Sequence, residues 1–222
     1  MPASTKDQSS AQVVKTLGKI REAIIRGELT PGAHLKENHL AETFRASRFH
    51  VRESLRFLQA EGLVESIPYK GNFVKAFTGK DAEELFTVRS ALEELGLRMM
   101  FPRLSAKLLR EFRTTFDKME AAADRGDVAA SAEADLKFHR MFCLHADNAR
   151  LLGMWDNLVP HVKLFLYMEK SIYTSDTGYV GSHVDLLRAL ECRKLDLAEA
   201  HLRIHLDSGL RHLLKEKFNT PE

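Results

Sequence analysis

The fold of the first part of this chain is decided by the stretch ASRFHVRESLRFLQAEGLVESIPYKGNFV, which runs from Ala46 to Val74. Ser47 is a good N-cap, and apolar residues recur behind it with helical spacing as far as Gly62. Two apolar stretches then flank the sequence PYKG, which is typical of a hairpin. We therefore predict a helix over residues 48–60 and two short strands over residues 63–67 and 72–77.

Two further helices are predicted before this stretch. Apolar residues recur with helical spacing between residues 11 and 25, and Gly27 is a natural stop. A turn-rich connector around Pro31-Gly32 leads to a short helix in the sequence KENHLAETF. The order helix, helix, tight turn, helix, hairpin is that of a winged helix-turn-helix. We predict this domain over residues 10–77, after a disordered N-terminus of residues 1–9.

From residue 78 onward the strand signals vanish and helical periods continue to the end of the chain. We predict an all-α bundle of about six helices over residues 78–218. The expected helices cover residues 80–101, 105–124, 127–146, 148–168, 179–192 and 195–217. The fold class is therefore mainly α, with an N-terminal winged helix-turn-helix and a C-terminal all-α bundle.

Composition and charge limit the class of protein. The 222 residues are 44% hydrophobic and 29% charged, which suits one large or two small domains with a core. Residues 1–77 hold 12 Lys/Arg and 8 Asp/Glu, and the remaining residues hold 21 and 23, so the basic part comes first. No apolar run is long enough to span a bilayer, and we see no signal peptide. We therefore expect a cytoplasmic protein with no membrane partner and with its two cysteines reduced.

The predicted third helix carries basic groups in its first turns. Arg48 and Arg52 are four residues apart and share a face, so one can hold a phosphate while the other reads guanine. Lys70 and Gly71 lie at the predicted hairpin tip, where glycine permits a close backbone approach. Alternatively, the two arginines are ordinary solvated charges on an amphipathic helix. The order of the elements favours binding to double-stranded DNA.

This part of the chain resembles the DNA-binding domain of the GntR family of bacterial transcription regulators. The resemblance implies a homodimer on a palindromic operator, with DNA contacts from Asn38, Arg48, Arg52, Lys70 and Gly71. The matching landmarks are Gly27, Leu29, Pro31-Gly32, Leu35, Glu37, Leu40-Ala41, Ser47-Arg48, Val51-Arg52-Glu53, Leu55, Leu58, Glu61-Gly62-Leu63-Val64 and Lys70-Gly71.

The sequence departs from this family directly after Ser47 and Arg48. The family usually has threonine and proline there, whereas this chain has Phe49 and His50. A threonine hydroxyl that contacts phosphate is therefore missing. We expect Phe49 to touch a thymine methyl group and His50 to bind a phosphate or a base. The preferred operator should differ from the common half-site of the family.

Four residues of the predicted bundle are candidate metal ligands. Asp135 and His139 are four residues apart and share one helical face, His183 opens a later helix, and His205 lies within the next. One carboxylate and three imidazoles suit zinc, nickel or another divalent ion. A single helical histidine is more often structural or exposed, and spacing alone does not bring the three segments together. His201 is an alternative ligand, with a surface role favoured.

The region from about residue 80 to residue 217 resembles the FCD effector-binding domain of the FadR-type branch. The sequences DLKFH and SHVDLLRALECRKLDLAEAHLRIH carry this resemblance. It implies that Asp135, His139, His183 and His205 hold a divalent metal ion, with zinc preferred over nickel. The founding fatty-acyl-responsive type lacks this site.

Arg89 lies in the sequence TVRSALEELG, which resembles the R-x-x-LE stretch of the same branch. A guanidinium near a metal can hold a carboxylate through two parallel hydrogen bonds. The alternative is an ion pair between Arg89 and Glu93 on the helix surface. We predict a small organic-acid effector bound by the metal and Arg89. The predicted function is a transcriptional regulator, a repressor like most relatives of this type.

The sequence offers two alternatives to a metabolite-controlled regulator. A helical metal-dependent hydrolase would need a general base, but the chain has no His-Glu-x-x-His run, and we predict no catalytic residue and no enzyme. A DNA-binding protein with a vestigial pocket is the second alternative. Bound metal and a response to organic acids would separate the sensor from that alternative.

Overall fold

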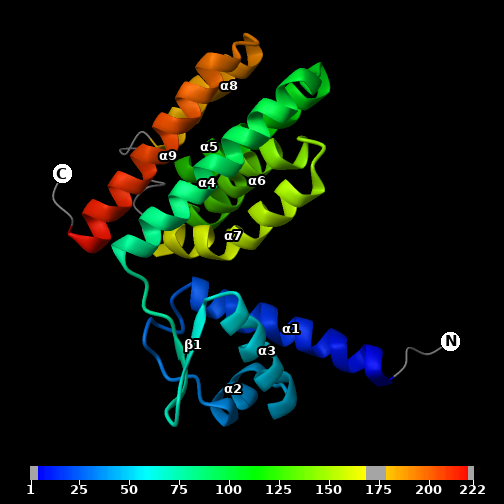
Figure 1. Ribbon diagram of the computed structural model, residues 1–222, viewed down its shortest axis with the longest axis vertical. Coiled ribbons are helices and arrows are strands. Elements are labelled where there is room, and N and C mark those ends of the chain that lie inside the picture. The colour runs from blue at the N-terminus through cyan, green and yellow to red at the C-terminus, as the bar shows by residue number, and fades with distance from the viewer. Residues whose placement is uncertain (1–4, 169–178, 220–222) are drawn as a thin grey trace. The chain divides into compact units, whose positions relative to one another are not determined.

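The structure is a computed structural model that describes residues 5–168 and 179–219 (Figure 1). The chain divides into two compact units, Met1–Phe77 and Thr78–Glu222. The first unit contains α1 (Thr5–Ile25), α2 (Glu37–Phe44), α3 (Arg48–Ala60), β1 (Val64–Ile67) and β2 (Gly71–Val74).

The three helices of the first unit bury one apolar face each. α1 contributes Ile20 and Ile24, α2 contributes Leu40, and α3 contributes Val51 and Leu58, all of them buried. The hydroxyl of Ser47 accepts a hydrogen bond of 3.2 Å from the backbone N–H of His50, which caps α3 as the sequence predicts. Because the apolar face of α3 is buried in this way, its opposite face is exposed to solvent.

β1 and β2 form the predicted antiparallel hairpin, paired from Val64 opposite Val74 to Ile67 opposite Gly71. The prediction that the second strand continues to residue 77 was wrong, because β2 ends at Val74, which pairs with Val64, the first residue of β1. The connector before α2 adds an outer edge to β2. In it, the Leu35 N–H donates to the Asn72 carbonyl at 2.8 Å and the Gly32 N–H to the Val74 carbonyl at 2.9 Å.

The prediction of a disordered N-terminus over residues 1–9 was wrong for residues 5–9. α1 begins at Thr5, and this polar stretch is the first part of the helix. The sequence TKDQSS contains no proline or glycine, so the helical hydrogen bonds continue from the apolar part through this stretch. A lack of apolar residues is compatible with a helix as well as with disorder. Residues 1–4 lie outside the described residues.

The second unit is helical throughout its described residues. Thr78 and Asp81 form a reciprocal capping box at the start of α4, and Ser105 and Asp127 cap α5 and α6. These caps explain why the predicted boundaries lie close to the observed ones. The elements are α4 (Gly79–Met100), the short 3-10 turn η1 (Phe101–Arg103), α5 (Ala106–Asp124), α6 (Val128–Leu144), α7 (Ala149–Met168), α8 (Tyr179–Glu191) and α9 (Leu195–Phe218).

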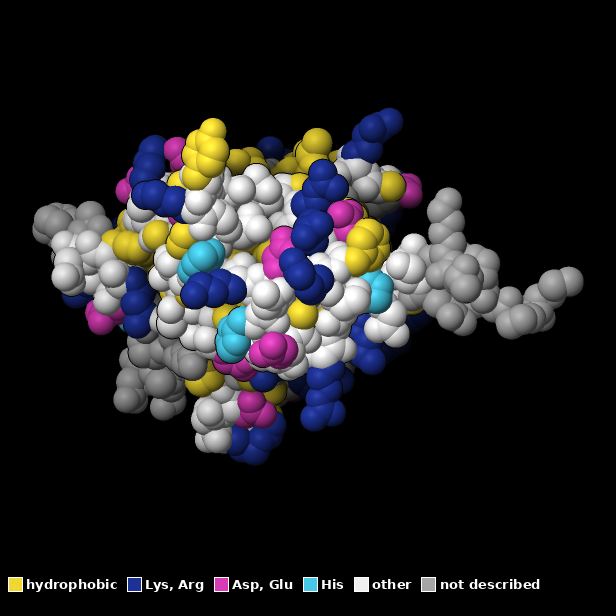
Figure 2. Space-filling view, turned by 90° about the horizontal axis from the view of Figure 1, so that it is seen from below, with side chains coloured by type: hydrophobic (Ala, Val, Ile, Leu, Met, Phe, Trp, Pro, Cys, Tyr) yellow, Lys and Arg dark blue, Asp and Glu magenta, His cyan; other side chains and the backbone are white. Residues whose placement is uncertain are grey.

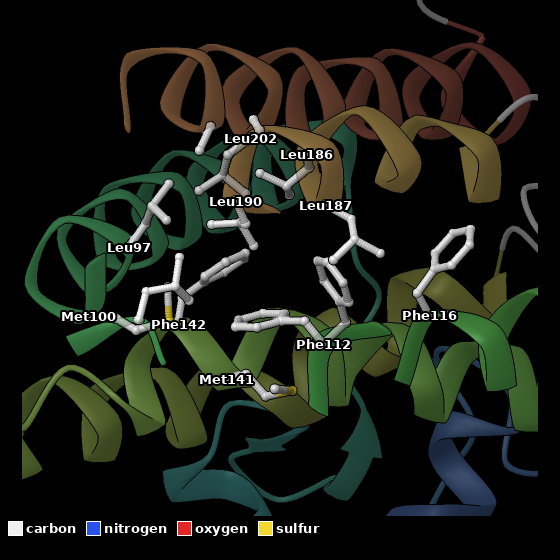
Figure 3. Packing of buried hydrophobic residues seen from close by; sticks show 14 of the residues in the cluster. Leu97, Met100, Phe112, Phe116, Met141, Phe142, Leu186, Leu187, Leu190 and Leu202 are labelled. Carbon is white, nitrogen blue, oxygen red and sulfur yellow. The ribbon is translucent and has the colours of Figure 1, made fainter. Parts of the chain in front are cut away.

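The core of the second unit lies between α4, α5, α6, α8 and α9. Figure 3 shows leucines of α8 and α9 directed toward Phe112 and Phe142. The rings of these two phenylalanines lie 5.3 Å apart, and Phe138 packs edge-on against Phe112 at 5.1 Å. This core holds in register the helices that carry the candidate metal ligands. The fold class predicted from the sequence is confirmed.

Within the described ranges, no helix combines the length and apolar character that crossing a bilayer requires.

Candidate nucleic-acid interface and metal centre

The first turn of α3 presents its side chains to solvent. Arg48 is exposed, Phe49 is 58% exposed, and His50 is half-buried with its ring 5.8 Å from that of Phe49. Ser47 is also exposed, although its hydroxyl already accepts the capping hydrogen bond. A large aromatic ring in solvent at a helix start serves no packing purpose in this unit, so it is available to a partner.

Arg52 is held by a residue that the sequence reasoning did not assign to the site. Its Nε and Nη2 atoms donate to the two carboxylate oxygens of Glu37 on α2, at 3.1 and 2.9 Å. The hydrogen bond from Arg52 lowers the pKa of Glu37 and outweighs its partial burial. The pair orients the guanidinium along the surface between α2 and α3. Asn38, the residue after Glu37, is exposed at the same surface.

The hairpin tip is exposed and conformationally special. Gly71 has a φ of +100°, and a Cβ built on it would lie 2.9 Å from Nε2 of His34. His34 stacks on Phe73 with ring centroids 4.7 Å apart, which holds its imidazole beside the tip. Lys70 is exposed, and so is Tyr69, whose φ of +64° directs it away from the strands. Sequence reasoning missed Tyr69 and His34; an aromatic residue in a proline-containing turn was the available signal.

Figure 2 shows cationic side chains distributed over the end of the first unit that holds α2, with histidine and acidic side chains between them. A second large apolar residue of α3 is exposed besides Phe49. Phe57 is 51% exposed and does not join Val51, Leu55 and Leu58 in the core. The exposed part of α3 therefore carries aromatic as well as cationic groups.

The four candidate metal ligands come together at one point in the second unit. Each of Asp135, His139, His183 and His205 is buried, and one ligand atom from each lies within 4.8 Å of the others. The Nε2 atom of His139 is 3.2 Å from that of His183 and 3.1 Å from that of His205. An Asp135 oxygen is 3.0 Å from Nε2 of His183. In a tetrahedral site, metal bonds of about 2.0–2.1 Å would place neighbouring ligand atoms about 3.3–3.4 Å apart, close to these separations.

The outer ring nitrogens of the three histidines are already occupied. His183 Nδ1 lies 3.2 Å from the Val180 carbonyl, which can only accept, so this nitrogen carries the proton. His139 Nδ1 lies 2.5 Å from a Glu93 oxygen, and His205 Nδ1 lies 2.7 Å from the Ser182 hydroxyl. The Nε2 atoms of His139 and His183 therefore face each other, while the Nδ1 atom of each ring already has a partner.

A bound cation would satisfy the buried donor atoms of this cluster. Burial lowers the pKa of both His139 and His205, which keeps their rings neutral. Neither oxygen of Asp135 has a hydrogen-bond partner of good geometry among the described residues, although the carboxylate is buried. Buried polar atoms without such partners are costly, and a divalent cation would satisfy them together with the imidazoles. The donor set therefore fits a metal ion. His201 and His212 are not in this cluster, as far as the described residues go.

Arg89 forms the ion pair with Glu93 that we considered from the sequence, but the pair is inside the protein. The Arg89 Nε donates to Glu93 at 2.7 Å, and both side chains have no exposed surface. The positive charge of Arg89 also contributes to the lowered pKa of Asp135, His139 and His205, which places it beside the ligands. The Arg89 guanidinium therefore lies near the candidate metal ligands. The expected position of this pair on the helix surface was wrong, because Arg89 and Glu93 face α6 across a close helix contact.

Comparison with known proteins follows the same division of the chain. The family described as bacterial regulatory proteins, gntR family, matches residues 13–74, and the FCD domain matches residues 84–208. The chain belongs to the GntR family. A probable D-xylose utilization operon transcriptional repressor of Paenarthrobacter nicotinovorans is 33% identical over 92% of both chains. The gluconate operon transcriptional repressor of Bacillus licheniformis is 26% identical and covers 87% of this chain and 82% of its own length.

Solved structures agree with the fold of this GntR-family protein. A putative GntR regulator from Rhodococcus sp. RHA1 superposes with a TM-score of 0.80 at 22% identity, covering 93% of this chain and 99% of its own. E. coli McbR/YncC gives 0.79 at 19% identity, with 92% and 98% covered. At these identities the similarity shows the fold. The family match and the 33% identical repressor make this chain a DNA-binding transcriptional regulator.

Proposed function

We propose that this protein is a repressor whose affinity for a palindromic operator is controlled by a small organic acid. The acid would bind at a divalent metal held by Asp135, His139, His183 and His205. One observation carries the proposal: four buried donor atoms lie within 4.8 Å of one another, in the unit that follows an exposed recognition helix. Zinc suits three imidazoles and one carboxylate, and nickel is the alternative ion.

The DNA side of the proposal rests on the exposed first turn of α3 and on the hairpin tip. Arg48 is available for a guanine edge or a phosphate, and Arg52 must share its guanidinium between Glu37 and DNA. The remaining proposed contacts come from Asn38, Ser47, Phe49, His50, Lys70 and Gly71. A DNA-binding protein of this kind would act in the cytoplasm.

The effector side rests on Arg89. Its buried guanidinium lies beside the cluster and is suited to a carboxylate, while a bound metal would supply positive charge for the acid's oxygens. The gluconate operon repressors bear the name of a sugar acid, and a polyhydroxy acid has the required oxygen donors. Effector binding must favour one arrangement of the protein over another to change DNA affinity.

Recognition of a palindrome requires a second copy of the chain. The outer surfaces of α4 and α9 provide a face for it. Val88 and Leu95 on α4, and Leu197 and Ile204 on α9, are exposed and lie seven residues apart in each helix. This spacing keeps apolar side chains on one stripe, which is typical of helices that pack against another helix. We infer a homodimer through these stripes.

The experiment that tests the function is selection of bound duplexes from a random DNA pool at about 0.15 M salt, where non-specific phosphate attraction is partly screened. An enriched inverted repeat, released by an organic acid only when metal is present, is the expected result. The base preferences opposite Phe49 and His50 would show what these residues read. Enrichment without any response to metal or acids would favour a regulator with a vestigial pocket. No enriched sequence would overturn the proposal.

A further inference from the structure

Glu93 connects the candidate metal ligand His139 to the side chains of Arg89 and Trp155. It lies on α4 and has no exposed surface. One carboxylate oxygen accepts hydrogen bonds from Arg89 Nε at 2.7 Å and from the indole N–H of Trp155 at 3.1 Å. The other oxygen lies 2.5 Å from Nδ1 of His139. Side chains from α4, α6 and α7 therefore meet at one carboxylate.

Glu93 determines how the His139 ring is held. Its carboxylate is paired with the Arg89 guanidinium at 2.7 Å, and a carboxylate in an ion pair of this kind is ionised. An ionised carboxylate can only accept, so the hydrogen on His139 Nδ1 must point at Glu93. The Nε2 lone pair of His139 then points at the other three ligands. The position of one oxygen atom thereby sets the tautomer and the orientation of a metal ligand.

Arg89 and Trp155 in turn hold Glu93 in place. Both donate to the same oxygen, which leaves the second oxygen for His139 alone. Glu83 and Glu84 lie on the same helix with exposed side chains and take no part in this network. A carboxylate behind a metal-bound histidine raises the basicity of the ring, and its loss typically weakens metal binding by about 10–100-fold.

We propose that Glu93 is a positioning residue that couples the metal centre to the effector clamp. It orients and polarises His139 through one oxygen, and it holds Arg89 through the other. The inference rests on the proposed metal site. It adds that metal affinity and the placement of Arg89 depend on a residue that contacts neither the ion nor the effector. Trp155, the only tryptophan of the chain, donates a hydrogen bond to the same carboxylate, so its fluorescence reports on changes at Glu93.

The test is competition for Zn²⁺ between the full-length protein and a fluorescent chelator. We expect E93Q to bind zinc about 10–100-fold more weakly than the unchanged protein. The matched control E83Q, on the same helix with an exposed side chain, should bind zinc like the unchanged protein. Equal affinity in E93Q and the unchanged protein would overturn the inference. If the unchanged protein itself binds no zinc, the proposed metal site fails, which is a different result.

A second variant keeps the test valid if E93Q does not fold, because E93Q leaves the Arg89 charge buried without its counter-ion. The double variant R89Q/E93Q removes both charges together, and we expect the same loss of zinc affinity. The unchanged protein offers a further measurement. Saturation with zinc should change the fluorescence of Trp155, with the same midpoint as the chelator competition. Full zinc affinity in the double variant, or an unchanged emission spectrum, would contradict the proposed coupling.

Discussion

The exposed side chains of Arg48 and Phe49 give the first turn of α3 two groups that can contact DNA. A phenylalanine that is 58% exposed gains nothing from the core of its own unit, and Arg48 beside it has an exposed side chain. Ser47 ends the preceding turn and starts the helix through its hydroxyl, so these two side chains project from a capped helix start. The arrangement provides one apolar and one cationic group for a groove.

Replacement of Arg48 by alanine should weaken specific operator binding by about 1–3 kcal/mol and relax the base preference at one position. The physical reason is the loss of a guanidinium that is exposed at the first turn of α3. The measurement is a fluorescence-anisotropy titration on the selected operator and on a scrambled duplex. Arg110→Ala removes the same charge from α5 in the second unit and serves as the control. Equal effects of both changes would contradict the assignment.

At the scale of the element, the metal centre joins helices that are distant in the sequence. Asp135 and His139 lie on α6, His183 on α8 and His205 on α9. Ser182 and Val180, in the first turn of α8, contact the outer nitrogens of His205 and His183. A bound ion would therefore tie the start of α8 to α6 and α9, which makes the helix arrangement depend on the metal.

Removal of the metal should lower the thermal stability of the protein. A ligand that binds only the folded state at about 100 times its Kd adds about 2.7 kcal/mol. Chelation by EDTA should therefore lower Tm by several degrees, and added zinc should restore it; differential scanning fluorimetry measures both. In His205→Ala, the ligand on α9 is lost, and Tm should no longer respond to EDTA. A response of the variant as large as that of the unchanged protein would contradict this assignment of the ligands.

α4 and α6 cross closely at Gly96. A Cβ at this position would lie 3.0 Å from backbone atoms of Phe142 and Cys143 and 3.1 Å from the Cys143 sulfur. Gly96→Ala should therefore destabilise the protein by about 1–3 kcal/mol, because backbone must move to accept the methyl group. Urea unfolding followed by circular dichroism measures the change.

Gly153 in α7 provides the matched control for Gly96. A Cβ there would meet no atom within 4 Å. Gly153→Ala should therefore stabilise the helix by up to about 1 kcal/mol through the higher helix propensity of alanine. Destabilisation by both alanine substitutions would show that the helix crossing at Gly96 is not the cause.

At the scale of the whole molecule, a palindromic operator needs two DNA-binding units, one from each copy of the chain. The exposed stripes of α4 and α9 predict where two copies meet. Leu95→Glu should place a charge in the apolar contact and shift the dimer toward monomer, as measured by sedimentation equilibrium. Operator affinity should fall as the dimer is lost, while binding of a single DNA-binding unit to a half-site should persist. Leu144→Glu changes an equally exposed leucine on α6 and should leave the dimer intact; a dimer unaffected by Leu95→Glu would place the interface elsewhere.

The order and type of the elements followed from local signals in the sequence. Ser47, Thr78, Ser105 and Asp127 cap helices, and each cap is readable without knowledge of the fold because its partner is only three residues away. The prediction for the polar N-terminal stretch was wrong from Thr5 onward because a polar helix end and a disordered segment can have the same composition.

The sequence by itself determined the fold class, the exposed basic start of α3 and the presence of a carboxylate and an imidazole one turn apart on α6. Only the tertiary structure brought His183 and His205 to that pair, since their helices meet α6 through packing between segments that are far apart in the chain. It also buried the Arg89–Glu93 pair and gave Glu93 its contact with His139. The contacts of His139 with Glu93, His183 and His205 join side chains 44 to 66 residues apart, and no local spacing encodes them.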